Sequence, residues 1–161
     1  MINAIVACDD NGGIGKNNTI PWPYNKEDMC YFKELTTNNI VVMGANTWHS
    51  KGMRAPLPNR YNVVVTTKNV LTPMPDLCIR ENVSKEILLL EERFSDKIIW
   101  IIGGSTLLSQ TSSIIDYWYI TRIGNVYQCD KFINKLWEDK KYKLIDSKNG
   151  KTAIFEIYSE I

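Results

Sequence analysis

The sequence has little of what metal-binding, membrane-spanning and nucleic-acid-binding proteins need. Its four cysteines lie far apart and it has one histidine, His49, so no zinc site is expected. No apolar run is long enough to span a bilayer, and the first residues lack the basic and apolar regions of a signal peptide. The 19 lysines and arginines nearly balance the 18 acids and form no block, so neither nucleic acid nor a membrane is an expected partner.

The remaining composition is ordinary for a soluble globular protein. A chain of 161 residues can bury one substantial core, which predicts a single domain covering residues 1–161. The scattered cysteines fit a reduced, cytoplasmic setting, and we expect a monomer. His49 has no second histidine, cysteine or carboxylate partner in the local pattern and is expected at the surface.

A helix is predicted to begin after Asn25. Pro21 and Pro23 prevent regular helix before it, and Asn25 is a good N-cap with an acid, Asp28, at the third position after it. Three apolar side chains then recur at helical spacing and predict an inward stripe: Met29, Phe32 and Leu35.

Asp28 falls on the same stripe, whereas Glu27 is predicted on the outer face with Tyr31 and Glu34. Trp22 lies just upstream, so the Asp28 carboxylate is predicted to face apolar surroundings. Burying a lone carboxylate is costly unless a ligand or a proton satisfies it, which makes Asp28 a candidate site residue. The alternative is that this acid only caps its own helix.

Residues 9–24 form a long polar loop punctuated by glycines. Gly13 to Lys16 suggests a phosphate loop, but that motif needs a glycine where this chain has Asp10 and a hydroxyl residue where it has Asn17. The dinucleotide fingerprint fails as well, because Asn18 replaces its last glycine. Loops of this length in a compact domain are usually lids or binding loops.

Strands and helices are predicted to alternate along the rest of the chain. Strands are predicted at 2–8, 40–43, 61–67, 77–80, 98–102 and 116–123, helices at 46–50, 84–94 and from 105, a loop at 69–76, and a hairpin of 142–146 and 152–158 turning at 149–150. This order predicts an α/β domain with a central mixed, mostly parallel sheet flanked by helices and closed by a C-terminal antiparallel hairpin. Gly103 and Gly104 let either a ligand or a neighbouring helix approach the backbone.

Seven motifs in register then resemble the dihydrofolate reductase family over essentially the whole chain. They are Gly13-Ile14-Gly15 with Ile20-Pro21-Trp22, Asp28 with Phe32, Met43-Gly44 with Thr47-Trp48, Leu57-Pro58-Asn59-Arg60, Ile102-Gly103-Gly104, Ile120-Thr121, and Phe155-Glu156-Ile157. The resemblance implies the NADPH-dependent reduction of 7,8-dihydrofolate to 5,6,7,8-tetrahydrofolate, by hydride transfer from the nicotinamide to the pterin. It also implies a role in one-carbon and thymidylate metabolism, and antifolate inhibitors as ligands.

The resemblance implies three catalytic residues. Asp28 would take the pterin's ring nitrogen and 2-amino group in a charge-assisted contact. Thr121 would join that network, and Trp22 would hold an ordered water. The implied substrate-binding residues are Ile5, Ala7, Asp28, Phe32, Leu57, Arg60, Ile102 and Thr121, with Arg60 clamping the glutamate carboxylate of the substrate. The alternative for Arg60 is a solvated arginine after a turn.

The cofactor contacts that the resemblance implies gather around the glycine pair, which a cis peptide joins in the family. They are Ala7, Ile14, Ile20, Gly44, Thr47, Thr66, Thr67, Lys68, Ile102, Gly103, Gly104, Ser105 and Thr106. Residues 9–24 would be the lid that closes over the nicotinamide.

Four positions depart from the family pattern. Ala45 and Thr106 stand where many members have a basic residue, so the 2′-phosphate would depend on Thr66, Thr67 and Lys68, with Arg80 near. This predicts a weakened preference for NADPH over NADH. Leu108 replaces an aromatic residue near the nicotinamide, and Lys51 replaces an apolar residue against the aminobenzoyl ring, which bears on antifolate affinity.

Two other functions compete with this interpretation. One is the pyrimidine-reducing enzyme of riboflavin synthesis, which has the same fold; Asp28, Trp22 and Arg60 favour folate over it. The other is a catalytically weak structural or binding homologue, which the missing cofactor cation permits and the set of Asp28, Trp22 and Thr121 opposes. Loss of NADPH absorbance with and without dihydrofolate separates the three.

Overall fold

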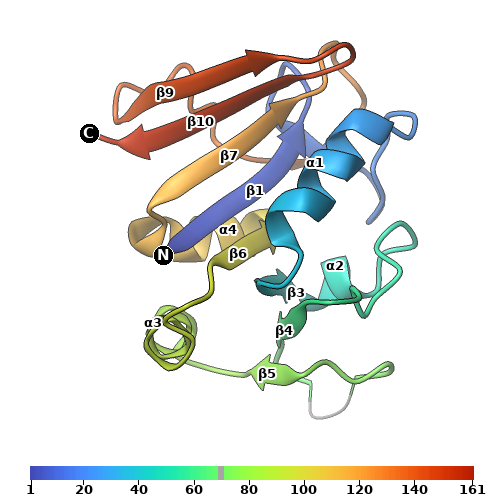
Figure 1. Cartoon of the computed structure of the whole chain (residues 1–161). Coiled ribbons are helices and arrows are strands. Elements are labelled where there is room, and N and C mark those ends of the chain that lie inside the picture. The colour runs from blue at the N-terminus through green and yellow to red at the C-terminus, as the bar shows by residue number, and fades with distance from the viewer. Residues whose placement is uncertain (69–70) are drawn as a thin grey trace.

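A central twisted sheet organises the computed structural model, which describes residues 1–68 and 71–161 (Figure 1). In this part of the chain the sheet has eight strands in the order β5-β4-β3-β6-β1-β7-β10-β9. Its strands are β1 (Ile2–Cys8), β3 (Ile40–Gly44), β4 (Tyr61–Val65), β5 (Leu77–Ile79), β6 (Ile99–Gly103), β7 (Tyr117–Arg122), β9 (Tyr142–Asn149) and β10 (Ile154–Glu160). All pairings from β5 to β7 are parallel and the last two are antiparallel, which confirms the predicted mixed sheet.

Helices cover both faces of the parallel part. They are α1 (Lys26–Thr36), α2 (Ala45–Trp48), α3 (Val83–Arg93) and α4 (Ser105–Thr111), followed by a 3-10 turn, η1 (Ser112–Ile114). Ile87 of α3 and Leu108 of α4 pack on one face, and Phe32 of α1 packs with Trp48 on the other. Because both faces are covered, the central strands are uniformly apolar, and each fully buried aliphatic side chain stabilises the fold by about 1.5–3 kcal/mol.

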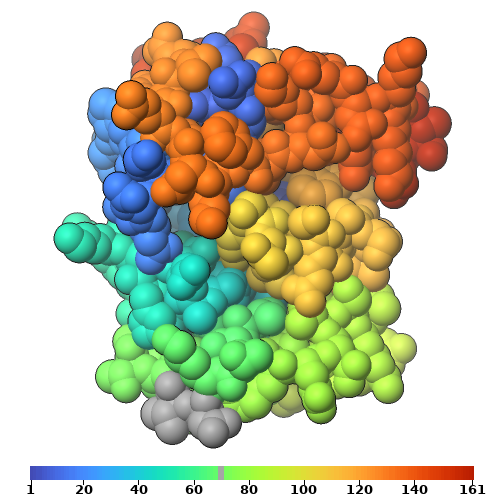
Figure 2. Space-filling view, turned by 180° about the vertical axis from the view of Figure 1, so that it is seen from behind, coloured from blue at the N-terminus to red at the C-terminus, as the bar shows by residue number. Residues whose placement is uncertain are grey.

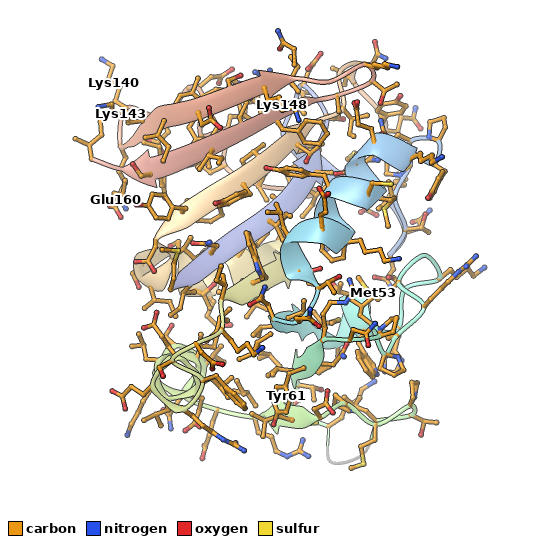
Figure 3. All side chains as sticks on the ribbon, viewed as in Figure 1. Met53, Tyr61, Lys140, Lys143, Lys148 and Glu160 are labelled. Atoms are coloured by element: carbon orange, nitrogen blue, oxygen red, sulfur yellow. The ribbon has the colours of Figure 1, made fainter. Side chains whose placement is uncertain are left out.

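The C-terminal hairpin forms as predicted, but its turn lies later than expected. β9 continues to Asn149, and the chain reverses over residues 150–153, where the Gly150 amide donates to the Ala153 carbonyl at 2.8 Å. β9 is the outer strand of the sheet, and Lys143 and Lys148 stand along it with Lys140 nearby (Figure 3). Charged side chains on an edge strand discourage pairing with another chain.

The outer face predicted for α1 is wrong for two residues. Tyr31 packs against Phe155 of β10, with 4.4 Å between the ring centroids. The Glu27 carboxylate accepts hydrogen bonds from the backbone amides of Lys151 and Thr152, both at 3.0 Å. Helical spacing predicts which side chains share a face of α1. It does not reveal that the C-terminal hairpin packs against a second face of this helix.

The remaining element boundaries differ from the predicted ones by at most a few residues. The third strand ends at Val65 rather than Thr67, the short helix begins at Ala45, and α3 begins at Val83. Part of the loop predicted at 69–76 lies outside the described residues. Among the residues described, no helix is long and apolar enough to cross a membrane.

A second, two-stranded sheet lies beside the main one. β2 (Gly13–Gly15), within the loop predicted at 9–24, pairs antiparallel with β8 (Lys131–Phe132). In the view from behind, these blue and orange segments lie together above the yellow segment that contains α4 (Figure 2). The predicted loop is therefore held by a partner segment more than a hundred residues away.

Candidate active site

Asp28 lies in the first turn of α1 and is half-buried. Burial raises the pKa of its carboxyl, and a hydrogen bond with the Thr121 side chain lowers it in part, so the net shift is upward. Thr121 is 1% exposed on β7, where it pairs with Ala7 of β1. The structure thus brings together the acid and the hydroxyl that sequence analysis paired.

The helix cap is supplied by Asn25 rather than by Asp28. The Asn25 Oδ1 atom accepts a hydrogen bond from the Asp28 backbone amide at 2.9 Å. Within the described residues, the Asp28 carboxylate accepts no hydrogen bond from the amides of its own helix end. The simple capping role therefore does not account for this carboxylate.

Trp22 is 6% exposed and lies against Tyr127, with 5.9 Å between the ring centroids. Tyr127 comes from the segment between β7 and β8, so this contact ties residues 9–24 to that segment. Asp130, in the same segment, donates its amide to the Gly15 carbonyl at 2.8 Å and accepts the Asn17 amide at 3.0 Å.

Asp9 is a buried residue that sequence analysis did not assign to the site. Its Oδ1 atom accepts the amides of Asn11 and Gly13, both at 2.8 Å, and its Oδ2 atom accepts the amide of Tyr127 at 2.9 Å. Burial alone raises the pKa of this carboxyl, but these three bonds and one from the Cys129 thiol lower it below its usual value. The run Asp9-Asp10-Asn11-Gly12-Gly13 was a detectable signal, since aspartate commonly accepts amides a few residues ahead in such turns.

Space around Gly13 is too small for any side chain. A Cβ atom there would lie 2.5 Å from the Cys129 sulfur and 2.9 Å from Asp9 Oδ2. Glycine is therefore required at position 13 because Cys129 and Asp9 lie so close to it, and not because a phosphate binds there. This agrees with the absence of a complete P-loop motif. The loop is anchored at its base by Asp9 and Gly13, while Ile20 near its tip is 52% exposed.

The carboxyl ends of β3 and β6 meet at the glycine pair. Gly103 and Gly104 are joined by a cis peptide bond, as the resemblance implied, and Gly103 has φ 123°, where a side chain is strained. The Thr47 hydroxyl of α2 would lie within 3.9 Å of a Cβ atom on either glycine. Gly44 and Ala45 are at the end of β3 beside them. Sheets of this kind bind ligands at such an edge.

A groove of about 520 Å³ runs along α4 and is lined by Ser105, Thr106, Ser109 and Gln110. Thr106 is exposed there, whereas Leu108 is 2% exposed in the main core. The groove therefore offers hydroxyl and amide groups but no cation from its own helix. Its Thr106 position is open to solvent, so a longer side chain can be accommodated.

Thr66, Thr67 and Lys68 follow β4, with the end of β5 alongside. The Thr66 amide donates to the Ile79 carbonyl at 2.9 Å, and the Thr66 hydroxyl accepts the Lys68 amide at 3.1 Å. Arg80 donates to the Lys68 carbonyl, so both cations are on one stretch of the sheet edge. Thr67 and Lys68 are exposed, and Thr66 is buried.

Arg60 stands across the sheet end from the C-terminal end of α1. Its Nε atom donates to the Pro58 carbonyl at 2.9 Å, and one terminal nitrogen donates to the Thr36 hydroxyl at 3.1 Å. Burial lowers the pKa of the guanidinium, as expected for a cation held away from water without a paired anion. These bonds fix the guanidinium fork and leave its outer edge available to a carboxylate.

The apolar wall residues fall into two groups. Ile5 is fully buried, and Phe32, Leu57 and Ile102 pack in the same cluster between α1 and the sheet. Ile14 packs with the other cluster, and Ala7 is half-buried on β1 next to Thr121. Lys51 is exposed, as is His49.

Comparisons with known proteins point to one family. The family model described as dihydrofolate reductase matches residues 1–159. The chain is 33% identical to the dihydrofolate reductase of Bacillus subtilis, over 93% of this chain and 84% of that protein. It is 30% identical to the enzyme of Sus scrofa, over 92% and 87%. A solved structure of dihydrofolate reductase from Enterococcus faecalis, complexed with NADP(H) and RAB-propyl, superposes with a TM-score of 0.83 at 27% identity, covering 99% of this chain and 96% of that one.

Proposed function

This chain belongs to the dihydrofolate reductase family, and from that premise we propose that it reduces 7,8-dihydrofolate to 5,6,7,8-tetrahydrofolate with NADPH. The observation that carries the proposal is the Asp28 carboxyl, which burial partly removes from water and which is hydrogen-bonded to Thr121. A site built this way suits a ligand that offers two adjacent N–H donors, as the ring nitrogen and 2-amino group of a pterin do. We also take residues 1–161 as one domain, acting as a monomer in the cytoplasm.

Asp28 would orient the pterin and bias its protonation. Its raised pKa means that this carboxyl keeps a proton to higher pH than an ordinary aspartate does. Thr121 hydrogen-bonds to the carboxyl from the sheet side. Trp22, which is buried, would close the pocket from the loop side. Asp28 would be occupied by the ring nitrogen and 2-amino group of the pterin. The different ring nitrogen that is protonated in the reaction would therefore receive its proton from a water held near Trp22.

The residues at the sheet edge fit a dinucleotide. Gly103 and Gly104 have no side chain that could stand between a ligand and their backbone, and the Thr47 hydroxyl lies beside them. Gly44, Ile102, Ser105 and Thr106 border the same edge. When bound, NADPH supplies the hydride, and the chemistry of that transfer belongs to the cofactor. Thr66, Thr67 and Lys68 would hold its 2′-phosphate.

Arg60 would bind the glutamate carboxylate of the substrate, with Ile5, Phe32 and Leu57 against the rings. Its guanidinium is already oriented by Pro58 and Thr36, so little side-chain freedom is lost on binding. Residues 9–24, with Ile14 and Ile20, would exclude water from the reacting atoms.

The test is the loss of NADPH absorbance with and without dihydrofolate, in the parent and in Asp28→Asn. Glu34→Gln, on an exposed position of the same helix, is the matched control. Dihydrofolate-dependent oxidation in the parent and in Glu34→Gln, but not in Asp28→Asn, supports the proposal. Oxidation that depends on an aminopyrimidine instead would assign the chain to riboflavin synthesis. No oxidation with either would make it a binding or structural homologue.

A further inference from the structure

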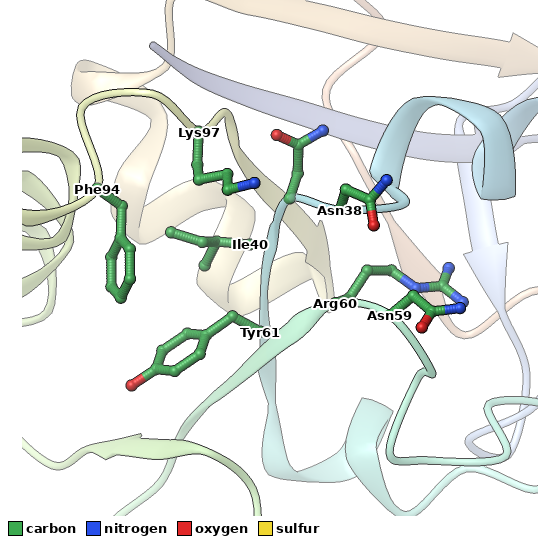
Figure 4. Close-up of a pocket in the computed structure, with 8 residues that line it drawn as sticks. Asn38, Ile40, Asn59, Arg60, Tyr61, Phe94 and Lys97 are labelled. Atoms are coloured by element: carbon green, nitrogen blue, oxygen red, sulfur yellow. The ribbon is translucent and has the colours of Figure 1, made fainter.

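Two of the proposed substrate residues, Leu57 and Arg60, stand on a loop. They lie between α2 and β4, in residues 49–60, which form neither helix nor strand. Figure 4 shows Arg60 where this loop enters β4, with Asn38 and Asn59 on the same side of a small pocket. Loops generally move more than the elements that they connect. A loop side chain that binds a ligand therefore needs contacts that fix the backbone beneath it.

Asn62, the second residue of β4, supplies contacts of this kind. It is 2% exposed, and its side-chain Oδ1 atom accepts the Leu57 amide at 2.9 Å. Its Nδ2 atom donates to the Leu57 carbonyl at 3.0 Å and to the Arg60 carbonyl at 2.9 Å. The side-chain amide thus bonds to both backbone groups of Leu57, as a neighbouring strand would, and it also holds the backbone of Arg60.

The surroundings of Asn62 are otherwise apolar. Asn62 pairs with Val41 of β3, and Val64, two residues further along β4, belongs to the apolar cluster that also contacts Leu57. Side chains two residues apart on a strand share a face of the sheet, so the amide lies on the face of this cluster. Burying an amide there is costly unless it is hydrogen-bonded. The three bonds to the loop remove that cost.

Other contacts of the loop act on the end of the Arg60 side chain. The Pro58 carbonyl and the Thr36 hydroxyl accept hydrogen bonds from the guanidinium. They orient its planar fork, whereas Asn62 fixes the backbone from which the side chain extends. The two sets of contacts therefore have different tasks.

We propose that Asn62 is a positioning residue for substrate recognition. It acts through Leu57 and Arg60, which would contact the aminobenzoyl and glutamate parts of dihydrofolate. Asn62 would thereby set how strongly the enzyme prefers a pterin that carries an aminobenzoylglutamate group over a pterin that lacks it. This inference rests on the proposed function and adds to it a determinant of selectivity between substrates.

The experiment measures kcat/KM by NADPH oxidation with two substrates. One is dihydrofolate and the other is 6-methyl-7,8-dihydropterin, which has the ring system without the aminobenzoylglutamate. Asn62→Ala removes all three bonds. Asn62→Thr suits a strand, and its hydroxyl has a single donor hydrogen, so it loses at least one of the two donated bonds.

The control is Asp76→Ala, at an exposed position. It removes the carboxylate that accepts the Asn62 backbone amide at 2.7 Å, a bond that does not involve residues 57–60. This variant disturbs β4 at the same residue and leaves the side-chain bonds of Asn62 to the loop in place. Melting followed by circular dichroism shows whether each variant is folded.

The ratio of the two kcat/KM values should fall about ten-fold in Asn62→Ala, because a displaced loop loses contacts to dihydrofolate alone. The loss should be mainly in KM for dihydrofolate, with kcat/KM for the dihydropterin within about two-fold of the parent. Asn62→Thr should be intermediate, and Asp76→Ala should melt earlier but keep the ratio. Equal losses for both substrates, an unchanged ratio in both Asn62 variants, or failure of both to fold would make Asn62 structural and overturn the inference.

Arg60→Leu tests the route of the effect. If Asn62 acts through Arg60, combining Asn62→Ala with Arg60→Leu should lower kcat/KM for dihydrofolate by less than the product of the two single effects. An effect equal to that product overturns the coupling.

Failure of the proposed function would be recognised separately. If the parent oxidises NADPH with neither substrate, the proposed function fails. Quenching of tryptophan fluorescence by the same two compounds then decides whether Asn62→Ala changes the preference for the aminobenzoylglutamate. A parent that binds neither compound overturns both proposals.

Discussion

The substrate side and the cofactor side of the site are built differently. Around the predicted pterin position, Asp28, Thr121 and Trp22 are buried or half-buried and fixed by neighbours from three parts of the chain. Around the predicted 2′-phosphate position, Thr67 and Lys68 are exposed side chains on a loop, and Thr106 stands in an open groove. Charges in a desolvated, fixed setting act strongly, whereas exposed ones are screened by water and salt. Substitutions on the substrate side should therefore have much larger effects.

Asp28→Asn should give the largest effect, since it removes the ionisable group from the desolvated pocket. We expect kcat at neutral pH to fall about 10²-fold or more, the usual contribution of a positioned acid–base group. Steady-state rates from pH 5 to 9 measure this. If Asp28→Asn keeps most of its turnover at neutral pH, Asp28 is not the catalytic acid, and the substrate side is no more sensitive to substitution than the cofactor side.

The same substitution has an opposite effect on stability. A raised pKa in the folded state makes ionisation costly there, so the parent loses free energy of unfolding as pH rises through the window between the usual aspartate pKa and the raised one. Asp28→Asn should be insensitive to that window and at least as stable as the parent at neutral pH. Urea unfolding below and above the window tests the sign, and a destabilised amide variant would indicate a structural role.

Arg60→Leu should raise KM for dihydrofolate about 10- to 150-fold, corresponding to the loss of roughly 1.5–3 kcal/mol of charge-assisted hydrogen bonding. KM for NADPH should stay close to the parent value, because Arg60 lies at the opposite end of the strands from the glycine pair. Lys140→Met, which removes a charge near the outer edge of the sheet, serves as the control. Equal losses for substrate and cofactor would make Arg60 structural.

Asp9→Asn tests the loop that both sides share. The amide nitrogen would face the Tyr127 amide, so two donors would meet and at least one buried bond would be lost, which costs about 1–3 kcal/mol of unfolding free energy. Because the folded pKa of Asp9 is lowered, its stabilisation is present above the usual aspartate pKa and is lost as pH falls through the folded one. Thermal melts from pH 3 to 7 should show parent and variant converging in acid. An unchanged melting temperature at pH 7 would mean that the loop is held elsewhere.

The smallest effects are expected at the cofactor phosphate. Lys68→Met should lower kcat/KM for NADPH by up to about five-fold and leave NADH nearly unchanged, since an exposed lysine contributes about 1 kcal/mol or less. Thr106→Arg should raise kcat/KM for NADPH, because a guanidinium fork can reach a phosphate from the open groove. Both effects should shrink in high salt. If Lys68→Met lowers kcat/KM equally for NADPH and NADH, Lys68 does not bind the 2′-phosphate, and Arg80 becomes the next candidate.

The sequence predicted the strands from local periodicity, and it predicted a mostly parallel sheet from the alternation of strands with helices. Asp28 was found from a carboxylate on an apolar helical stripe, whereas Arg60 and Thr121 were assigned through family resemblance and have no local signal. The local turn around Asp9 could have been predicted, but its contact with the Tyr127 amide could not, because Tyr127 is distant in sequence. Tyr31 and Glu27 were misplaced for a similar reason, since the hairpin that covers them comes from the end of the chain.

Glu27 carries a consequence for the order in which the site is completed during synthesis. Its carboxylate is bound by Lys151 and Thr152, one residue before Asp28 on the same helical turn, and Phe155 pairs with Thr121 in the sheet. A nascent chain that has not yet emerged from the ribosome past residue 155 has neither the amides that hold the start of α1 nor the strand that covers Thr121. Contacts between such distant residues form late in folding. The pterin pocket should therefore be assembled only after residues 151–155 have been translated, and a truncation just before them should be as damaging to it as one far earlier in the chain.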